Sequence, residues 1–232
     1  MTKYNHQSVQ ATGASLREIV FGMEDGMVST LGAVTGIAIG SQDHFMVVMA
    51  GMVIIAVESI SMGVGSYLSN RSQQDLHHRV LHEEREEIKD YPHEEQHELN
   101  RMFIRDGWPP HLAEHMTEVA AKDRHLMLQE MAYRELNIAG TSHGTPIRNG
   151  IYMFIAYVVG GMVPLLAYLL MSVSQAMPIS IVVTLLGLFG LGAATTRLTK
   201  GGWFRSGLRI MILGGLAMVI GLVVGNFAKD LK

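Results

Sequence analysis

The sequence predicts an all-α membrane protein in which five transmembrane helices carry a three-helix insert between the second and the third. Of the 232 residues, 48% are hydrophobic and 25 are glycines, and soluble domains rarely combine so much glycine with long uncharged runs. Each apolar run approaches the roughly 20 residues needed to cross the hydrocarbon core. The five runs are 19–40, 45–69, 151–172, 179–196 and 208–227. We expect three regions: residues 1–69 with spans one and two, the insert over 70–149, and residues 150–232 with spans three to five.

The charge distribution predicts how the spans cross the membrane. Residues 1–15 are polar and no small-residue cleavage site follows the first apolar run, so this run is predicted to be a retained helix and not a signal peptide. Lys and Arg gather in the insert and in the turn between spans four and five. The positive-inside rule places both in the cytoplasm. Five spans then put the N-terminus inside and the C-terminus outside.

The insert is the one long polar segment, and it holds nine of the eleven histidines and fifteen of the twenty-one acids. Its apolar residues recur at helical spacing, which predicts helices over 71–90, 93–105 and 110–138. The first is predicted to continue directly from span two. Pro92 and the turn over 107–110 separate the three helices.

The acids of the insert repeat at a spacing that suits ligands. Glu84 and Glu87 are three residues apart, as are Glu95 and Glu98, so each pair shares a helical face. Four other acids have a basic partner at helical spacing: Glu83 with Arg79, Glu86 with Lys89, Glu118 with Lys122, and Glu130 with Arg134. Glu84, Glu87 and Glu95 have none. Two interpretations stay open, a divalent-cation site or a solvated acidic surface.

Near the end of the insert, Met131 and Glu135 are four residues apart, so a thioether and a carboxylate share a face. Such a mixed set favours borderline metals such as ferrous iron or manganese over calcium or magnesium. Glu94 and His97 form one Glu-x-x-His motif, and ferritin-like di-iron sites need two.

Two apolar runs contain an acid at membrane depth, Asp25 in the first and Glu58 in the second. An ionisable side chain there costs at least a few kcal/mol and usually lines an ion or proton path. Met62 lies one turn after Glu58 on the same face, so a hard and a soft ligand converge. Gly32, Gly36 and Gly40 follow Asp25 at four-residue spacing, which predicts close helix packing. The phosphate-binding loop of ATP-driven pumps does not occur in the sequence.

Residues 16–228 resemble the vacuolar iron transporter family. The resemblance is carried by Asp25-Gly26 with Ser29-Thr30, by Ser61-Met62-Gly63, by Gly65-x-Tyr67-x-Ser69, and by the Gly-Gly-x-x-Pro164 step of span three. Members of that family are dimeric, proton-coupled exporters of ferrous iron and other divalent metals from the cytosol. The resemblance therefore implies a homodimer in a lipid bilayer, with protons and a divalent metal ion as substrates, Fe or Mn first and Zn or Co next. Nucleic acid is not expected as a partner.

The resemblance also assigns residues. It implies that Glu84, Glu87, Glu95, Glu98, Met131 and Glu135 bind metal, and that Asp25 and Met62 belong to the transport path, where Glu58 is added on the residue argument above. Two positions depart from the family pattern: Ser66 stands where Glu is frequent, and Glu58 where a small residue is usual. The membrane would be an inner membrane in a bacterium or a vacuole-type membrane in a eukaryote.

The sequence thus favours a secondary transporter over an enzyme. The main alternative is a membrane-anchored di-iron oxidase or ferroxidase that uses the acid- and histidine-rich insert. A metal-storage or sensor protein is the third, and it leaves the intramembrane Asp25 and Glu58 unexplained.

Overall fold

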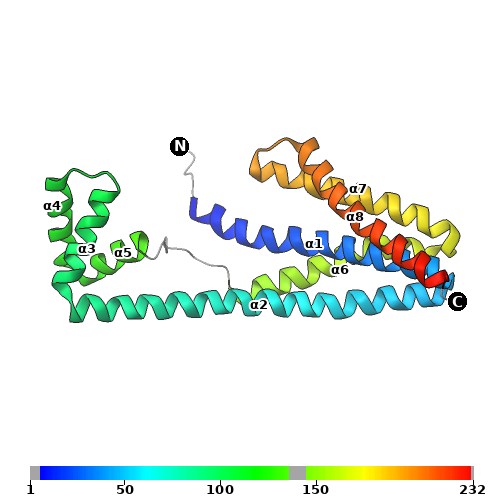
Figure 1. The fold of residues 1–232 in the computed structure, drawn as a ribbon, viewed down its shortest axis with the longest axis horizontal. Helices are drawn as coiled ribbons and strands as arrows, with labels where there is room; N and C mark the ends of the chain where they lie inside the picture. The colour runs from blue at the N-terminus through cyan, green and yellow to red at the C-terminus, as the bar shows by residue number, and fades with distance from the viewer. Residues whose placement is uncertain (1–5, 136–144, 231–232) are drawn as a thin grey trace. The chain divides into compact units, whose positions relative to one another are not determined.

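The part of the chain described by the computed structural model, residues 6–135 and 145–230, folds entirely into helices (Figure 1). In chain order they are α1 (His6–Ser41), α2 (His44–Asp90), α3 (Pro92–Arg105), α4 (Pro110–Ala121), α5 (Arg124–Arg134), α6 (Pro146–Leu170), α7 (Val173–Thr199) and α8 (Trp203–Asp230). They divide into two compact units, one of residues 1–68 and 144–232 and one of residues 69–143. Helix α2 runs unbroken through the boundary, as predicted for span two and the first insert helix.

Of the described helices, four are long and apolar enough to cross a membrane: α2, α6, α7 and α8. They contain the predicted spans two, four and five, and span three up to Leu170, where α6 ends two residues before the predicted end of that span. Helix α1 contains the predicted first span and has 36 residues, but it does not reach the same apolar composition. The adjacent acids Glu24 and Asp25, together with the glycines that follow them, account for the difference. That α1 crosses the membrane therefore stays a prediction.

The two helices α1 and α6 approach closely at their glycines. A Cβ atom built on Gly26 would collide with the backbone oxygen of Tyr157, and one built on Gly160 would collide with that of Met23. Small residues permit such approach, which is the main packing device between helices in a membrane. This contact fixes the position of Asp25 on α1 relative to α6.

Helix α8 packs on α1 in the same manner. A Cβ atom on Gly36 would lie 2.9 Å from the backbone oxygen of Gly221, and one on Gly225 would collide with the backbone oxygen of Gly36. Gly32 faces Ala217, whose backbone oxygen would lie 3.1 Å from its added Cβ. The predicted packing role is confirmed for Gly32 and Gly36.

In the unit of residues 69–143, the helices share one hydrophobic core. Its buried members are Ile88, Leu99, Met102, Phe103, Ala113, Ala120, Met127 and Met131. The prediction of a single helix over 110–138 is wrong, because the chain breaks between α4 and α5; residues 136–138 lie outside the described part. Asp123 adopts an extended conformation there, and its side chain accepts hydrogen bonds from the backbone N–H groups of His125 and Leu126. This N-cap starts a new helix where helical periodicity alone continues the old one.

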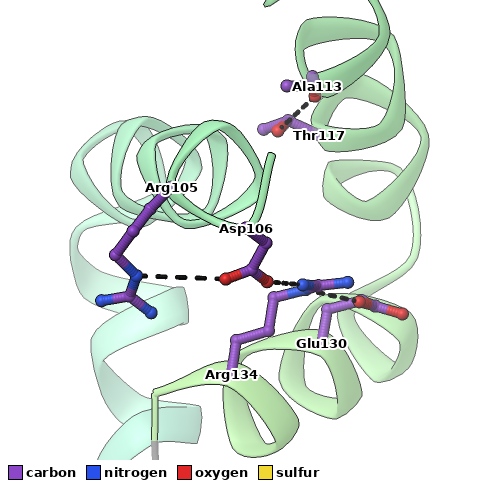
Figure 2. Close-up of polar contacts among 6 residues, drawn as sticks. All are labelled: Arg105, Asp106, Ala113, Thr117, Glu130 and Arg134. Carbon is purple, nitrogen blue, oxygen red and sulfur yellow. Dashed lines mark hydrogen bonds and ion pairs between the residues drawn. The ribbon is translucent and has the colours of Figure 1, made fainter. Parts of the chain in front are cut away.

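A nearly buried arginine fastens α5 to the end of α3. Figure 2 shows Arg134 between two carboxylates, Glu130 on its own helix and Asp106 at the C-terminal end of α3. The guanidinium also lies over the ring of Phe103, 4.3 Å from its centroid. Only 12% of the Arg134 side chain is exposed. These contacts fix the orientation of α5 and of the residue that follows it, Glu135.

We predict that Gly160→Ala destabilises the protein. The added methyl group collides with the α1 backbone at Met23, and overpacking of this kind costs roughly 1–3 kcal/mol. Gly65→Ala is the matched control, because a Cβ atom there meets nothing within 4 Å. Thermal unfolding of the detergent-solubilised protein measures both. Equal unfolding temperatures for the two variants would contradict the close α1–α6 packing.

We predict that Arg134→Met loosens α5. Hydrogen bonds to charged groups contribute about 1.5–3 kcal/mol, so the opening free energy of α5 should fall by about that amount in amide hydrogen exchange. Arg79→Met removes an arginine whose pair with Glu83 is exposed, and should leave exchange of α5 unchanged. Unaltered protection of α5 in Arg134→Met would show that other contacts hold this helix.

Candidate functional site

The insert brings five glutamates together from three segments. Glu84 and Glu87 lie on α2, Glu95 and Glu98 lie on α3, and Glu135 caps the C-terminal end of α5. We call these five side chains the carboxylate cluster. Glu84 and Glu95 are only 3% and 8% exposed. Glu84 hydrogen-bonds to both Glu135 and Glu95, so residues 51 positions apart in sequence meet here.

The cluster holds protons more tightly than isolated glutamates do. Burial, followed by repulsion from Glu135, Glu95 and Glu87, raises the pKa of Glu84 to about 8. Burial and repulsion from neighbouring cluster members also raise the pKa of Glu95 and of Glu135. Both effects disfavour the charged carboxylate. The hydrogen bonds between carboxyl groups require a proton on one partner, and Glu84 is the member most suited to carry it.

No basic side chain neutralises the cluster. In the part of the chain that the structure describes, none of its five members forms an ion pair. The predicted ion pairs of Glu83, Glu86 and Glu130 are present, at 2.8, 3.2 and 3.1 Å from their basic partners. Glu118 lies 3.9 Å from His115, and its predicted pair with Lys122 is not among those that the described residues form. Glu84, Glu87 and Glu95, the acids for which no basic partner was predicted, all belong to the carboxylate cluster.

The donor set of the cluster suits a divalent cation. The Oε1 atom of Glu84 is buried and has no hydrogen-bond partner among the described residues, and carboxylate oxygens are the ligands of hard and borderline cations. No three His, Asp or Glu side chains of the described ranges already converge to hold a metal ion, so binding requires side chains of the cluster to turn inward. Met131 is fully buried in the hydrophobic core of the insert.

A second group of polar residues lies between α1, α2 and α6. The phenolic oxygen of Tyr157 on α6 lies 2.5 Å from the hydroxyl of Ser29 on α1, and it donates a 3.1 Å hydrogen bond to Glu58 on α2. Asp25 is half-buried one turn before Ser29, within electrostatic reach of Glu58. We call Asp25, Ser29, Glu58 and Tyr157 the helix junction. The structure thus brings the two predicted membrane acids together.

The same face of α1 carries a third acid that the sequence reasoning missed. Glu18 is buried, accepts a 2.9 Å hydrogen bond from Ser66 on α2, and pairs at 2.9 Å with the exposed Arg17. Glu18 lies two turns before Asp25, and Ser66 lies about two turns after Glu58, as expected for an antiparallel hairpin. The seven-residue spacing between Glu18 and Asp25 was the available signal, but the predicted span began one residue too late to include it.

Met62 lies on α2 between Glu58, at the helix junction, and Ser66, the donor to Glu18. It is half-buried, one turn from Glu58 and one turn from Ser66. The α1–α2 hairpin therefore presents, in order along its length, a buried acid with its serine donor, a thioether, and a pair of acids held by a tyrosine. Carboxylate and thioether groups are both metal ligands, so side chains able to bind a cation follow one another along the hairpin.

The chain is similar to known proteins over most of its length. Residues 16–226 match the VIT family. Vacuolar iron transporter 1 of Oryza sativa subsp. japonica is 30% identical over 207 residues, which cover 89% of this chain and 82% of the relative. Vacuolar iron transporter 1 of Arabidopsis thaliana is 30% identical over 206 residues, with 88% and 82% covered. The vacuolar iron transporter of Toxoplasma gondii is 26% identical over 237 residues, with 98% and 78% covered.

The family match spans the α1–α2 hairpin, the insert and the three later helices, so it includes both groups of acids described above. With relatives that are matched over most of their own length, this chain belongs to the VIT family.

Proposed function

We propose that this protein is a proton-coupled transporter that moves ferrous iron or another divalent metal, such as manganese, out of the cytosol. The observation that carries the proposal is the helix junction, where Asp25 and Glu58 from two different helices lie within electrostatic reach inside apolar surroundings. Two like charges at such a place require a proton or a cation to neutralise them. Exchange of one for the other is the elementary step of antiport.

The carboxylate cluster supplies the second part of the proposal. It captures the metal from the cytosol, with Glu84, Glu87, Glu95, Glu98 and Glu135 as oxygen ligands and Met131 as the soft ligand that favours iron or manganese, with zinc or cobalt as further substrates. Met131 reaches the metal only by leaving its place in the core. The buried, protonated Glu84 means that capture releases protons.

The proposed assembly is a homodimer with five spans per protomer, α1 included, and with the insert in the cytoplasm. The side chain of Glu58 is exposed on its own protomer, although the helix around it is apolar. A carboxylate facing lipid is costly, whereas one facing a partner helix or a water-filled path is tolerated. A second copy against α2 satisfies this requirement. The membrane is a vacuole-type membrane in a eukaryote or the inner membrane in a bacterium.

We predict that Asp25→Asn abolishes proton-driven metal flux. The amide keeps the shape of the side chain but removes the charge that is exchanged between proton and metal. Purified protein is reconstituted into liposomes that contain a fluorescent divalent-metal reporter, a proton gradient is imposed, and Mn²⁺ is added outside. We expect at least a tenfold lower initial rate than in wild type, as for loss of an interaction worth about 1.4 kcal/mol or more.

Asp43→Asn is the matched control for this experiment. Asp43 lies exposed in the turn between α1 and α2, where its side chain accepts a hydrogen bond from the N–H of Met46, and an asparagine can do the same. This variant should transport as wild type does. Wild-type flux in Asp25→Asn would remove the junction from the path. If wild type carries no metal but consumes oxygen on addition of ferrous iron, the protein is a ferroxidase.

We predict that the metal affinity of the cluster rises with pH through about pH 8. Below that pH Glu84 is protonated, because its pKa is raised to about 8, and the metal must displace the proton. Each displaced proton strengthens apparent binding by up to about tenfold per pH unit below the pKa. Mn²⁺ titration of the full-length protein, followed by the magnetic resonance signal of free Mn²⁺, measures the affinity at several pH values.

The substitutions Glu84→Gln and Glu83→Gln distinguish the effect of a cluster acid from that of a neighbouring acid outside the cluster. Glu84→Gln should bind Mn²⁺ more weakly and lose most of the pH dependence between about pH 6 and about pH 8. Glu83 is adjacent in sequence but pairs with Arg79 on the exposed side of α2, so Glu83→Gln should behave as wild type. An unchanged pH profile in Glu84→Gln would assign the displaced proton to another group.

A further inference from the structure

We propose that Tyr157 is a positioning residue that holds the Glu58 carboxylate beside Asp25 at the helix junction and so keeps the two acids together as one cation site. The inference rests on the proposed transport function and adds to it a residue outside the metal ligands and transport acids predicted from the sequence. It also gives a structural role to Glu58, the acid that departs from the family pattern.

The hydrogen bonds of the Tyr157 hydroxyl have a definite direction. A phenol has one proton to donate, and it donates that proton to the Oε2 atom of Glu58 at 3.1 Å. The Ser29 hydroxyl, 2.5 Å away, must then donate to the phenolic oxygen. The chain of hydrogen bonds therefore runs from Ser29 through Tyr157 to Glu58, and the serine donor strengthens the bond that the tyrosine gives.

The tyrosine is held in place by its surroundings. Its side chain is fully buried, and its backbone oxygen lies so close to Gly26 that a Cβ atom on the glycine would collide with it. Both the ring and the backbone of Tyr157 are therefore fixed against α1, on the helical face that also carries Asp25 and Ser29. A donor with so little freedom presents its proton at a fixed point.

Glu58 itself has no such restraint from its own helix. Its side chain is exposed on the protomer, and a glutamate has three rotatable bonds with which to turn away from α1. The hydrogen bond from Tyr157 opposes this rotation and keeps the carboxylate within electrostatic reach of Asp25. The pair is thereby kept as a two-carboxylate site for a cation, not as two separate acids.

The titratable groups that face Glu58 are Asp25 on α1 and Tyr157 on α6, and Glu24 lies within electrostatic reach of Asp25. Removal of the phenolic hydroxyl takes away the one hydrogen bond from α6 to this carboxylate and should therefore loosen the two-carboxylate site.

The test is Tyr157→Phe, measured in the same liposome assay with Mn²⁺. A hydrogen bond to a charged group contributes about 1.5–3 kcal/mol, so we expect KM for Mn²⁺ to rise by about tenfold or more. Tyr168→Phe is the matched control: Tyr168 is equally buried, three turns further along α6, and the change should leave KM as in wild type.

A double-mutant cycle distinguishes positioning from a general structural effect. If Tyr157 acts through Glu58, then Tyr157→Phe added to Glu58→Met, which has no acceptor for the phenol, should cause no further change in KM. A full effect of Tyr157→Phe in the Glu58→Met background would overturn the inference, as would wild-type kinetics of Tyr157→Phe itself. Absence of flux in the wild type would instead refute the proposed function, so the two failures are distinguishable.

Ser29→Ala provides a second variant that removes only the donor to Tyr157. It should shift KM in the same direction as Tyr157→Phe but by less, since the tyrosine keeps its own bond to Glu58. Thermal unfolding and the elution volume of each variant establish that it is folded. If Tyr157→Phe does not fold, an unaltered KM in folded Ser29→Ala would overturn the proposal.

Discussion

The described structure depends on carboxylates that lie close together without a basic partner, some of them buried. Five of them form the cluster in the insert, where burial and mutual repulsion raise the pKa of Glu84 to about 8. Two more, Asp25 and Glu58, meet in the helix junction. Removing a charge from water costs several kcal/mol unless something compensates it. A proton and a divalent cation are the two available compensators, so the same arrangement that disfavours free charge makes protons and metal compete.

Such repelling groups stay together only because the helices around them are held by other contacts. At the junction, Gly26 and Gly160 allow the α1 and α6 backbones to touch, so Asp25 cannot recede from Tyr157 by separation of the helices. In the insert, Arg134 ties α5 to α3 through Asp106 and thereby orients Glu135. In both places the packing energy of glycines, apolar core and one arginine opposes the electrostatic repulsion.

The sequence predicted the helices and the acids well, because both have local signals. Apolar runs located four spans that the structure contains, and the lack of nearby basic residues singled out Glu84, Glu87 and Glu95. The break before α5 depended on a single cap, Asp123, which competes with an unbroken apolar periodicity. The partners of the acids could not be predicted, because the Tyr157–Glu58 bond joins positions 99 residues apart. Only the tertiary fold brings such residues together.

The α1–α2 hairpin carries its acids at two levels that are held in different ways. At one level Ser66 on α2 donates its hydroxyl to the buried Glu18 on α1. Two turns away the carboxylate comes from α2, as Glu58, and its donor is Tyr157 on α6. At this second level Asp25 on α1 lies within electrostatic reach of Glu58, so two acids from two helices face each other. Under the proposed function a divalent cation between them would remove their mutual repulsion, and the fixed position of Tyr157 keeps one of the two carboxylates in place.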